Sequence, residues 1–361
     1  MGLATYGWSV LLSTSLCRSM PRLFLLLAAA VLVWPCRAEM PPSLNTPISN
    51  TQDWKAEYRR PTDIPFPDDN PYTAAKAELG KTLFFDPMLS GDGTHSCSTC
   101  HQPGLSWGDG LAHAVGTGGT IMPLRSPTLL NVAWSDIAGW DGKFETIESV
   151  AFAAILGRRN MNQTEARLLG QLREMPGYVA AFHSAFPDGQ VNRRNTELAL
   201  ATFERTIVSA RAPFDRWIDG DPTAMGAEAQ HGFEVFRGKG HCAACHIGWN
   251  FTEGAFYDVG LAAGDEVGRG RLFPQSVALQ HAFKVPTLRD VARRGPYMHD
   301  GSLPSLEAVV EFYDSGGLDR PSRSPLIQPL GLGPEEKHDL IVFLGTLTED
   351  PVPFAVPVLP R

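Results

Sequence analysis

Two short cysteine motifs constrain this chain more than any other feature of its sequence. One pattern occurs twice, 145 positions apart, as Cys97-Ser-Thr-Cys100-His101 and as Cys242-Ala-Ala-Cys245-His246. The chain has six cysteines, and the remaining two, Cys17 and Cys36, lie near its N-terminus. A fold of this sequence must therefore present two separate cysteine pairs, each followed at once by a histidine.

This spacing fits the covalent attachment of haem c. Two thiols separated by two residues can add to the two vinyl groups of one haem, and the next histidine is placed to bind the iron from one face. Each motif is predicted to hold one haem, with His101 and His246 as iron ligands. A zinc site of four cysteines would not require the histidine twice, and a thioredoxin-like pair belongs beside a βαβ pattern that this sequence lacks.

Residues 1–38 are typical of a cleaved export signal. Arg22 precedes an unbroken apolar run over 23–34, and small residues stand at the recognition positions of a cleavage site near Ala38. The run is too short to span a bilayer. Met20 begins a complete signal by itself, so Met1 and Met20 are both candidate start sites. We expect a mature protein in the periplasm without a membrane anchor.

Net charge and the number of cysteines exclude some classes of partner and of structural bond. Residues 1–38 contain three arginines and no acidic residue, so their removal changes the formal net charge from −8 to −11. A negative balance argues against nucleic acid and against an anionic membrane surface as partners. Cys17 and Cys36 leave with the signal, and no cysteine then remains for a structural disulfide.

Hydrophobic periodicity predicts a mainly α-helical chain. Apolar residues recur at helical spacing over 73–85, 145–156, 164–175, 196–217, 224–237, 304–314 and 334–347. A helix followed by glycine and then by CxxCH occurs twice, which indicates an internal repeat of a small unit. The turn-rich residues 219–222 mark the expected boundary between two domains, 39–220 and 221–361.

Several longer motifs resemble one known family. They are SPTLLNVAW (126–134), WDGKFETIESVA (140–151), FKVPTLRDVA (283–292) and PYMHDGSLPSLEAVV (296–310). Together with the CxxCH pairs, in this order, they are similar to the di-haem cytochrome c peroxidase and MauG superfamily over about residues 75–347. The MauG-like branch, with its methanobactin-cassette (MbnH-like) members, is the nearest subgroup in this interpretation.

The resemblance implies two cytochrome c-like haem domains packed together. The N-terminal haem, on His101, would react with hydrogen peroxide, and the C-terminal haem, on His246, would be an electron-transfer centre with two axial ligands. Trp140 matches the tryptophan that lies between the haems in the family. Arg289 is expected to pair with a haem propionate, because its forked cation suits a carboxylate.

Tyr313 has two interpretations. Leu306, Val309, Val310 and Tyr313 follow helical spacing, which by itself favours an ordinary core tyrosine. In the conventional peroxidases, however, a methionine fourteen residues after the histidine of the HDG motif binds the second iron, and Tyr313 is fourteen residues after His299. The resemblance therefore makes Tyr313 the predicted second ligand, as in MauG-like members. Met298 is the alternative ligand.

The distal group of the peroxide site departs from the family pattern. Cleavage of peroxide needs a group that accepts a proton from one oxygen and returns it to the other. The family glutamate falls at Asn160, which can hold peroxide by hydrogen bonds but cannot carry its proton. Glu165 lies a short distance further on and is the substitute candidate; for Glu145, Glu148 and His113 a structural or solvated role is the simpler interpretation.

The resemblance also implies a calcium ion held between the domains by an asparagine and backbone carbonyls. Arg125 replaces that asparagine, and Arg294 and Pro296 occupy the second segment. Two guanidinium groups would repel a cation and could themselves bridge carbonyls or propionates. These residues argue against calcium and leave two covalent haems as the expected cofactors.

Three functions are compatible with these features. The first is a peroxide-dependent enzyme that oxidises tryptophan in a small exported partner protein through a His/Tyr-ligated second haem. The second is a conventional peroxidase that reduces hydrogen peroxide with electrons from a small redox protein, which ligation by Met298 would favour. The third is a non-enzymatic di-haem electron carrier, which the missing acid at Asn160 would favour.

Overall fold

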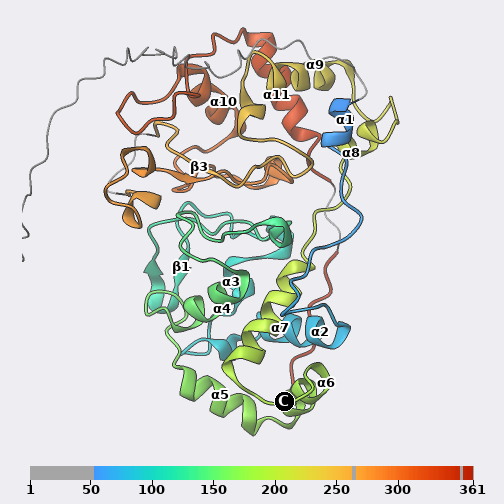
Figure 1. The fold of residues 1–361 in the computed structure, drawn as a ribbon, viewed down its shortest axis with the longest axis vertical. Helices are drawn as coiled ribbons and strands as arrows, with labels where there is room; N and C mark the ends of the chain where they lie inside the picture. Colours follow the sequence, from blue (N-terminus) through green and yellow to red (C-terminus); the bar gives the residue numbers. More distant parts are fainter. Residues whose placement is uncertain (1–52, 262–265, 350–352, 361) are drawn as a thin grey trace, which may run out of the picture. The chain divides into compact units, whose positions relative to one another are not determined.

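A computed structural model describes residues 53–261, 266–349 and 353–360, and the predicted export signal lies outside them. The prediction of a mainly helical fold is confirmed. The α-helices are α1 Asp53–Glu57, α2 Ala74–Phe85, α3 Cys97–Cys100, α4 Ile147–Leu156, α5 Glu165–Glu174, α6 Pro176–Ala185, α7 Arg193–Arg205, α8 Pro213–Ile218, α9 Ala227–Arg237, α10 Leu306–Ser315 and α11 Pro334–Gly345 (Figure 1). Within the described residues, no helix has the length and apolar character needed to cross a bilayer.

Apart from isolated bridges, the β-structure of the described residues consists of two short hairpin-like pairs. Strand β1, Val115–Gly116, pairs antiparallel with β2, Thr120–Ile121. Strand β3, Phe256–Tyr257, pairs antiparallel with β4, Phe283–Lys284. One pair follows each CxxCH motif in the chain, and short 3₁₀ turns and loops connect the rest.

The predicted single helix over 196–217 is wrong. Helix α7 ends at Arg205, and a separate helix, α8, begins at Pro213. Proline has no N–H to donate to the preceding turn and forces the residue before it into extended backbone, so a helix can start at Pro213 but cannot run through it. Ala212 is accordingly extended, with φ −85° and ψ 167°.

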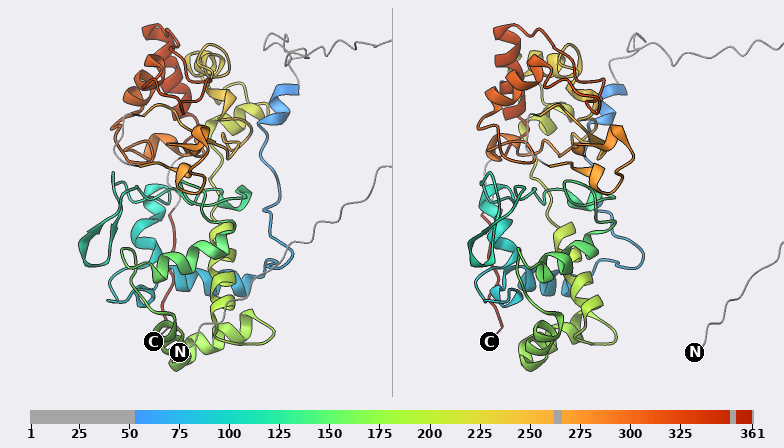
Figure 2. Two further views of the ribbon diagram at one scale, coloured as in Figure 1. Left: turned by 60° about the vertical axis from the view of Figure 1, so that its left-hand side comes forward. Right: turned by 90° about the vertical axis from the view of Figure 1, so that its left-hand side faces the viewer.

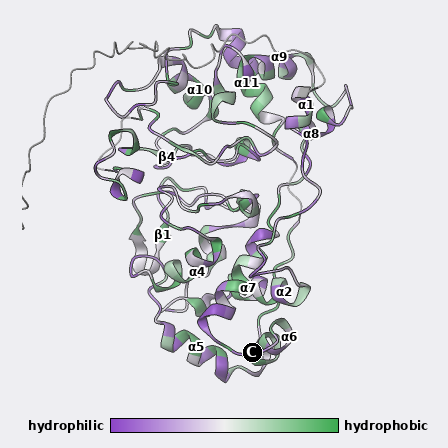
Figure 3. Cartoon of the chain, in the orientation of Figure 1, coloured by the Kyte–Doolittle hydropathy of each residue, from purple (hydrophilic) through white to green (hydrophobic). Residues whose placement is uncertain are grey.

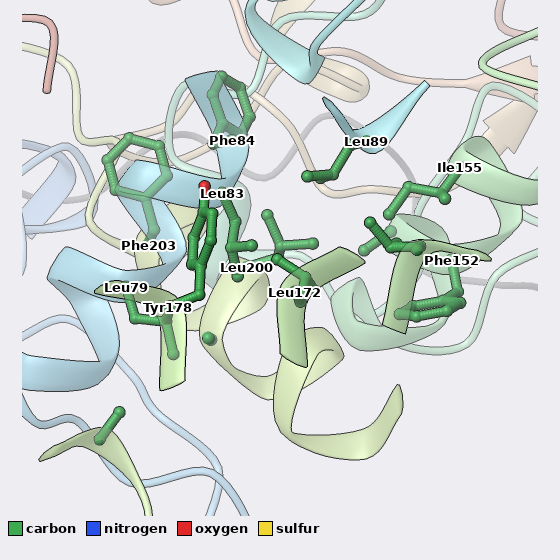
Figure 4. Close-up of a cluster of buried hydrophobic side chains, with 14 of the residues drawn as sticks. Leu79, Leu83, Phe84, Leu89, Phe152, Ile155, Leu172, Tyr178, Leu200 and Phe203 are labelled. Carbon is green, nitrogen blue, oxygen red and sulfur yellow. The ribbon is translucent and has the colours of Figure 1, made fainter. Parts of the chain in front are cut away.

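Buried apolar side chains form two clusters. The first core cluster runs from Leu79 to Ile207 and includes residues of α2, α4, α5, α6 and α7 (Figure 4). The second core cluster contains Tyr58 and runs otherwise from Phe214 to Leu347, with many packed phenylalanine rings. Helix α5 shows the usual basis of such packing, since it carries both hydrophobic and hydrophilic residues along its length (Figure 3) and buries only its leucines.

A glycine permits close helix packing ahead of each CxxCH motif. Helix α2 crosses α7 at Gly80, where a Cβ atom would overlap the backbone carbonyl of Ala199. Helix α9 crosses α11 at Gly232, where a Cβ atom would overlap the carbonyl of Asp339. The two helices that lead into the motifs therefore use the same packing device, which supports the internal repeat inferred from sequence.

The last described segment, 353–360, packs on the first core cluster although it follows α11 of the second. The ring of Phe354 stacks on Phe85, with centroids 5.4 Å apart, and meets Trp107 edge-on at 5.1 Å. Lys81 lies 4.9 Å from the same ring. Figure 2 shows this segment, in dark red, extending to the helices of that cluster.

Candidate functional site

One cavity of about 1240 Å³ is lined by both CxxCH motifs. A cavity for a single small ligand has roughly 300–1,000 Å³, so this volume exceeds what one ordinary ligand requires. The walls also include Trp140, Asn160, Met298 and Tyr313. The structure thus brings together most of the residues that the sequence singled out.

The two motif histidines are fixed in the same way. Nδ1 of His101 donates to the carbonyl of Trp107 at 3.2 Å, and Nδ1 of His246 donates to the carbonyl of Phe251 at 2.8 Å. A carbonyl only accepts hydrogen bonds, so Nδ1 carries the proton and Nε2 keeps its lone pair. Burial lowers the pKa of both rings, that of His246 to about 4. Each histidine is therefore a neutral donor suited to iron.

The four cysteines are free of disulfides and line the cavity in two separate pairs. Burial raises the pKa of every one of these thiols, that of Cys242 to about 12 and that of Cys245 to about 11. Among the described residues, no group of three or more His, Cys, Asp or Glu side chains lies close enough to hold a metal ion. The geometry thus suits two thioether attachments and does not assemble a four-cysteine zinc site.

Tyr313 lies in the cavity wall. Helix α10 begins after Ser305, whose Oγ accepts the N–H of Ala308, and ends before Gly316 in left-handed backbone at φ +80°. Burial raises the pKa of Tyr313, and the thiols of Cys242 and Cys245 add to this effect. Its phenol has no hydrogen-bond partner within the described part of the chain. The buried side of α10 therefore faces the second CxxCH motif.

Met298 lines the same cavity, on a loop rather than on a helix. Its backbone is left-handed, with φ +70°, and the loop is closed where Tyr297 N donates to Leu303 O at 2.7 Å. The next residue, His299, is buried, stacks on Phe283 at 3.4 Å between ring centroids, and leaves Nε2 without a partner. Both candidate second ligands, Met298 and Tyr313, are thus present in one cavity.

Hydrogen bonds hold Trp140 in place through both its side chain and its backbone. Its indole Nε1 donates to the carbonyl of Arg125 at 3.0 Å, and its own carbonyl accepts the backbone N–H of Lys284 at 2.9 Å. The loop that carries it is closed by pairing of Ala138 with Phe144. These bonds tie Trp140 to segments on both sides of the cavity.

The structure separates the two predicted distal residues. Asn160 lines the cavity, and its carbonyl accepts the N–H of Thr117 at 2.7 Å. Glu165 does not line it: this residue starts α5 and forms an ion pair with Arg193 at 3.2 Å, with both side chains more than two-fifths exposed. The acid proposed as a substitute is therefore a surface carboxylate of the helix N-terminus.

Arg289 is also placed differently from the prediction. Its side chain is fully buried and forms an ion pair with Asp215 at 2.8 Å, while Nε donates to the carbonyl of Trp249 at 2.7 Å. It is not among the residues that line the cavity. Asp215, 74 positions away in the sequence, takes the place predicted for a propionate carboxylate.

Two ionisable residues of the wall, the buried Glu204 and the half-buried Lys284, were missed by sequence reasoning. Burial raises the pKa of Glu204, at the end of α7, to about 8. Burial lowers the pKa of Lys284 to about 8, and its ammonium group donates to Ser135 and to the carbonyl of Ile137. Glu204 belongs to no motif. The sequence does not indicate that Lys284 contacts Ser135 and Ile137 of the loop before Trp140.

The fold and the site define a helical c-type haem protein with two attachment sites. The family model for di-haem cytochrome c peroxidase matches residues 74–223. Methylamine utilization protein MauG of Methylorubrum extorquens is 47% identical over 308 residues, 85% of this chain and 87% of the relative. The MauG of Methylophilus methylotrophus is 41% identical over 88% of this chain and 95% of the relative.

The solved structures agree with this likeness. A MauG-like protein associated with microbial copper homeostasis gives a TM-score of 0.75 at 27% identity, covering 81% of this chain and 95% of that one. The di-haem peroxidase BthA of Burkholderia thailandensis gives 0.67 at 19% identity, covering 81% and 91%, which supports the fold alone.

The chain belongs to the di-haem cytochrome c peroxidase and MauG family. It is a MauG-like di-haem oxidoreductase with protein-oxidising function, and the family implies two c-type haems. Family membership therefore favours an enzyme over the non-enzymatic electron carrier.

Proposed function

We propose that this enzyme uses hydrogen peroxide to oxidise a tryptophan side chain of a small exported partner protein, with Tyr313 as the second axial ligand of the haem on His246. The observation that carries the proposal is the position of the Tyr313 phenol, in the cavity wall beside Cys242 and Cys245 and without a hydrogen-bond partner among the described residues. The side chain is half-buried and its hydroxyl borders the cavity, so it is free to bind a group held there.

An iron ligand would account for that phenol. When bound, the haems supply the redox chemistry, and an anionic oxygen ligand favours the ferric state, whereas a thioether raises the potential. Tyr313 must lose its proton to ligate iron, and burial of the phenol opposes this loss, so ligation would be accompanied by proton release. A site of this kind is a poor acceptor from an ordinary cytochrome and a good store for an oxidising equivalent.

The other wall residues take supporting roles in the proposal. Trp140, held between Arg125 and Lys284, would carry oxidising equivalents between the haem sites, because its indole is fixed in orientation. Asn160 would hold peroxide by hydrogen bonds in the site of His101. Proton transfer would then need another group, and Glu204 in the same wall is a carboxyl that burial keeps protonated at neutral pH.

Identity favours one class of partner. The relatives that share 47% and 41% identity are methylamine utilization proteins, whereas the copper-homeostasis protein shares 27%. We therefore propose a partner from methylamine utilization in preference to the methanobactin-type partner suggested by sequence. The predicted signal segment favours a periplasmic enzyme, whose partner would then also be exported. The formal charge of −11 after cleavage favours a partner with a basic docking face.

The proposal also keeps two haem domains but moves the boundary between them. The first core cluster ends at Ile207 and, apart from Tyr58, the second begins at Phe214, which favours a division between these residues over the one predicted near residue 220. Tyr58 packs in the second core cluster, and Phe354 against the first. Each proposed domain is therefore completed by a segment from the far end of the chain.

A conventional cytochrome c peroxidase remains the second candidate. Met298 lines the cavity, and the cytochrome-c peroxidase IdrP1 of Denitromonas iodatirespirans is 37% identical over 79% of this chain. Ligation by Met298 would raise the potential of the second haem and would suit electron uptake from a small redox protein.

The ferric EPR and optical spectra of the purified di-haem protein separate these candidates. The comparison includes wild type, Tyr313→Phe and, as a matched control, Met298→Leu. We expect the low-spin signal of one haem to change in Tyr313→Phe and to persist in Met298→Leu. Persistence in Tyr313→Phe together with loss in Met298→Leu would overturn the proposal and identify a conventional peroxidase.

A further inference from the structure

Two arginine side chains lie together in the cavity wall without a carboxylate partner. Arg125 Nη2 donates to the backbone carbonyl of Arg294 at 2.8 Å, and Arg294 Nη2 donates to the carbonyl of Thr287. Both Nε atoms are buried and have no partner, and only 9% of Arg125 is exposed. Within the described part of the chain, neither guanidinium forms an ion pair.

Burying two guanidinium groups without a negatively charged partner costs folding free energy. A buried charge is stable only when it is paired and hydrogen-bonded, and arginine stays protonated in proteins. Burial and the neighbouring charge of Arg125 together lower the pKa of Arg294 to about 10. Two adjacent positive charges of low solvent exposure therefore require a negative charge nearby.

The acidic residues around the pair do not provide that charge directly. Asp109 and Asp290 are the carboxylates that act on these guanidinium groups, together with the phenol of Tyr297. Asp109 is engaged elsewhere, accepting the hydroxyl of Ser126 at 3.0 Å and the N–H of Leu111 at 3.0 Å. Asp290 forms no ion pair with either arginine, so the compensating anion must come from the cavity.

The position of the pair identifies the anion. Arg125 and Arg294 both line the cavity, and Thr287, whose carbonyl accepts from Arg294, donates its hydroxyl at 2.8 Å to the carbonyl of Asn250, four residues after His246. The haem expected on His246 carries its negative charge on two propionate carboxylates, and a guanidinium fork matches a carboxylate geometrically. We propose that Arg125 and Arg294 together bind a propionate carboxylate of the haem at the second CxxCH motif.

The same geometry disagrees with a calcium ion at this place. The carbonyl of Arg294, which the family resemblance assigns to calcium, already accepts a hydrogen bond from Arg125. A divalent cation would face two positive charges and one occupied carbonyl. In this chain a cationic side chain stands where the family pattern has a metal, and the pair is an anion site.

The pH dependence of the haem reduction potentials tests the proposal. Wild-type holoprotein, Arg125→Gln and Arg294→Gln are titrated spectroelectrochemically, and covalent haem content is measured for each. A propionate held by two guanidinium groups stays ionised, so the wild-type potential of the haem on His246 should change little over about pH 5.5–8. In each variant the propionate is buried with less compensation and its pKa rises, so the potential of one haem should fall as the pH rises through this range.

Two controls keep the outcome decisive. Arg167→Gln removes an exposed arginine of α5 that also donates to a carbonyl, that of Gly91, and should behave as wild type. If the glutamine variants lose haem, Arg125→Lys and Arg294→Lys retain the charge and should keep a flat profile. Wild-type profiles in both folded glutamine variants would overturn the proposal. A wild-type potential that depends on phosphate or chloride concentration would also overturn it, since a free inorganic anion would then occupy the pair.

Discussion

The indole Nε1 of Trp140 donates a hydrogen bond of 3.0 Å to the backbone carbonyl of Arg125. The backbone N–H of Arg125 in turn donates to the carbonyl of His299 at 3.1 Å, and its side chain reaches Arg294. One residue therefore fixes an aromatic ring of the cavity wall and connects it to the loop of the HDG motif. The orientation of Trp140 and the charge of the cavity wall depend on the same short segment.

Replacing Trp140 with phenylalanine should separate electron transfer from folding. Trp140→Phe leaves the Arg125 carbonyl without its donor, which costs about 1 kcal/mol of stability. We expect both haems to be retained and the spectral response of the second haem to one equivalent of peroxide to become slower. Stopped-flow absorbance measures that response. An unchanged rate would show that Trp140 is only a packing residue.

Replacing Tyr313 with methionine should convert the second haem toward a conventional peroxidase centre. A thioether ligand favours ferrous iron and raises the reduction potential, whereas a phenolate lowers it. Tyr313→Met should therefore raise one of the two potentials and speed reduction by a small cytochrome donor. Potentiometry of the variant beside wild type checks this, and equal potentials would argue that Tyr313 does not bind iron.

The buried ion pair between Glu148 and Arg205 should be important for stability. The guanidinium binds both carboxylate oxygens, at 2.6 and 3.0 Å, and Asn70 donates to the same carboxylate at 2.9 Å. Glu148→Ala leaves a buried charge uncompensated, so we expect a loss of about 3–5 kcal/mol. Urea unfolding followed by circular dichroism measures it.

The exposed pair of Glu165 with Arg193 is the matched control for that measurement. Glu165→Ala should cost roughly 0–1 kcal/mol, because solvent screens the pair. Equal losses in Glu148→Ala and Glu165→Ala would contradict the assignment of Glu148 to the core rather than to chemistry.

Glu204 should make stability depend on pH. Burial raises its pKa from the usual value of 4.5 to about 8 in the folded chain. Between these values the unfolded chain loses the proton and the folded chain keeps it, so the contribution of Glu204 to stability falls as the pH rises. Glu204→Gln should lose less stability than wild type between about pH 5 and 8. Glu174→Gln, at an exposed helix end, should resemble wild type in the same urea titrations.

A chelator should leave the protein unchanged. Because Arg125 occupies the Arg294 carbonyl, dialysis against EDTA is expected to alter neither the haem absorption spectrum nor the reaction with peroxide. Added calcium should likewise have no effect. A loss of reactivity that calcium restores would show that the guanidinium moves aside for the ion.

Features carried by local pattern could be predicted from sequence. The CxxCH motifs place four cysteines and two histidines in one cavity, and helical periodicity located α2, α4, α5, α9, α10 and α11 within a few residues. Tyr313 was the informative case, since the pattern that marks a buried helix face cannot tell a core from a cavity wall. Its offset of fourteen residues from His299, compared with the family, is what led to its prediction as an iron ligand.

Features that depend on distant partners could not be predicted. The motif around Arg289 does not indicate that its ion-pair partner is Asp215. The residues next to Glu204 in the sequence do not indicate that its side chain is buried. Pro213 is a signal for a helix break in the sequence, but the apolar residues at helical spacing on both sides of it favoured one continuous helix. Tertiary charge pairing and desolvation, rather than local propensity, decided each of these outcomes.

The stacking of Phe354 has a practical consequence for handling the protein. Trp107, which packs against Phe354, provides the carbonyl that orients the ring of His101, the predicted iron ligand. Proteolytic trimming of the tail would remove the ring that packs on Phe85 and Trp107. Preparations that differ only in how their C-terminus was engineered would then differ in haem spectrum, although no residue of the cavity had been changed.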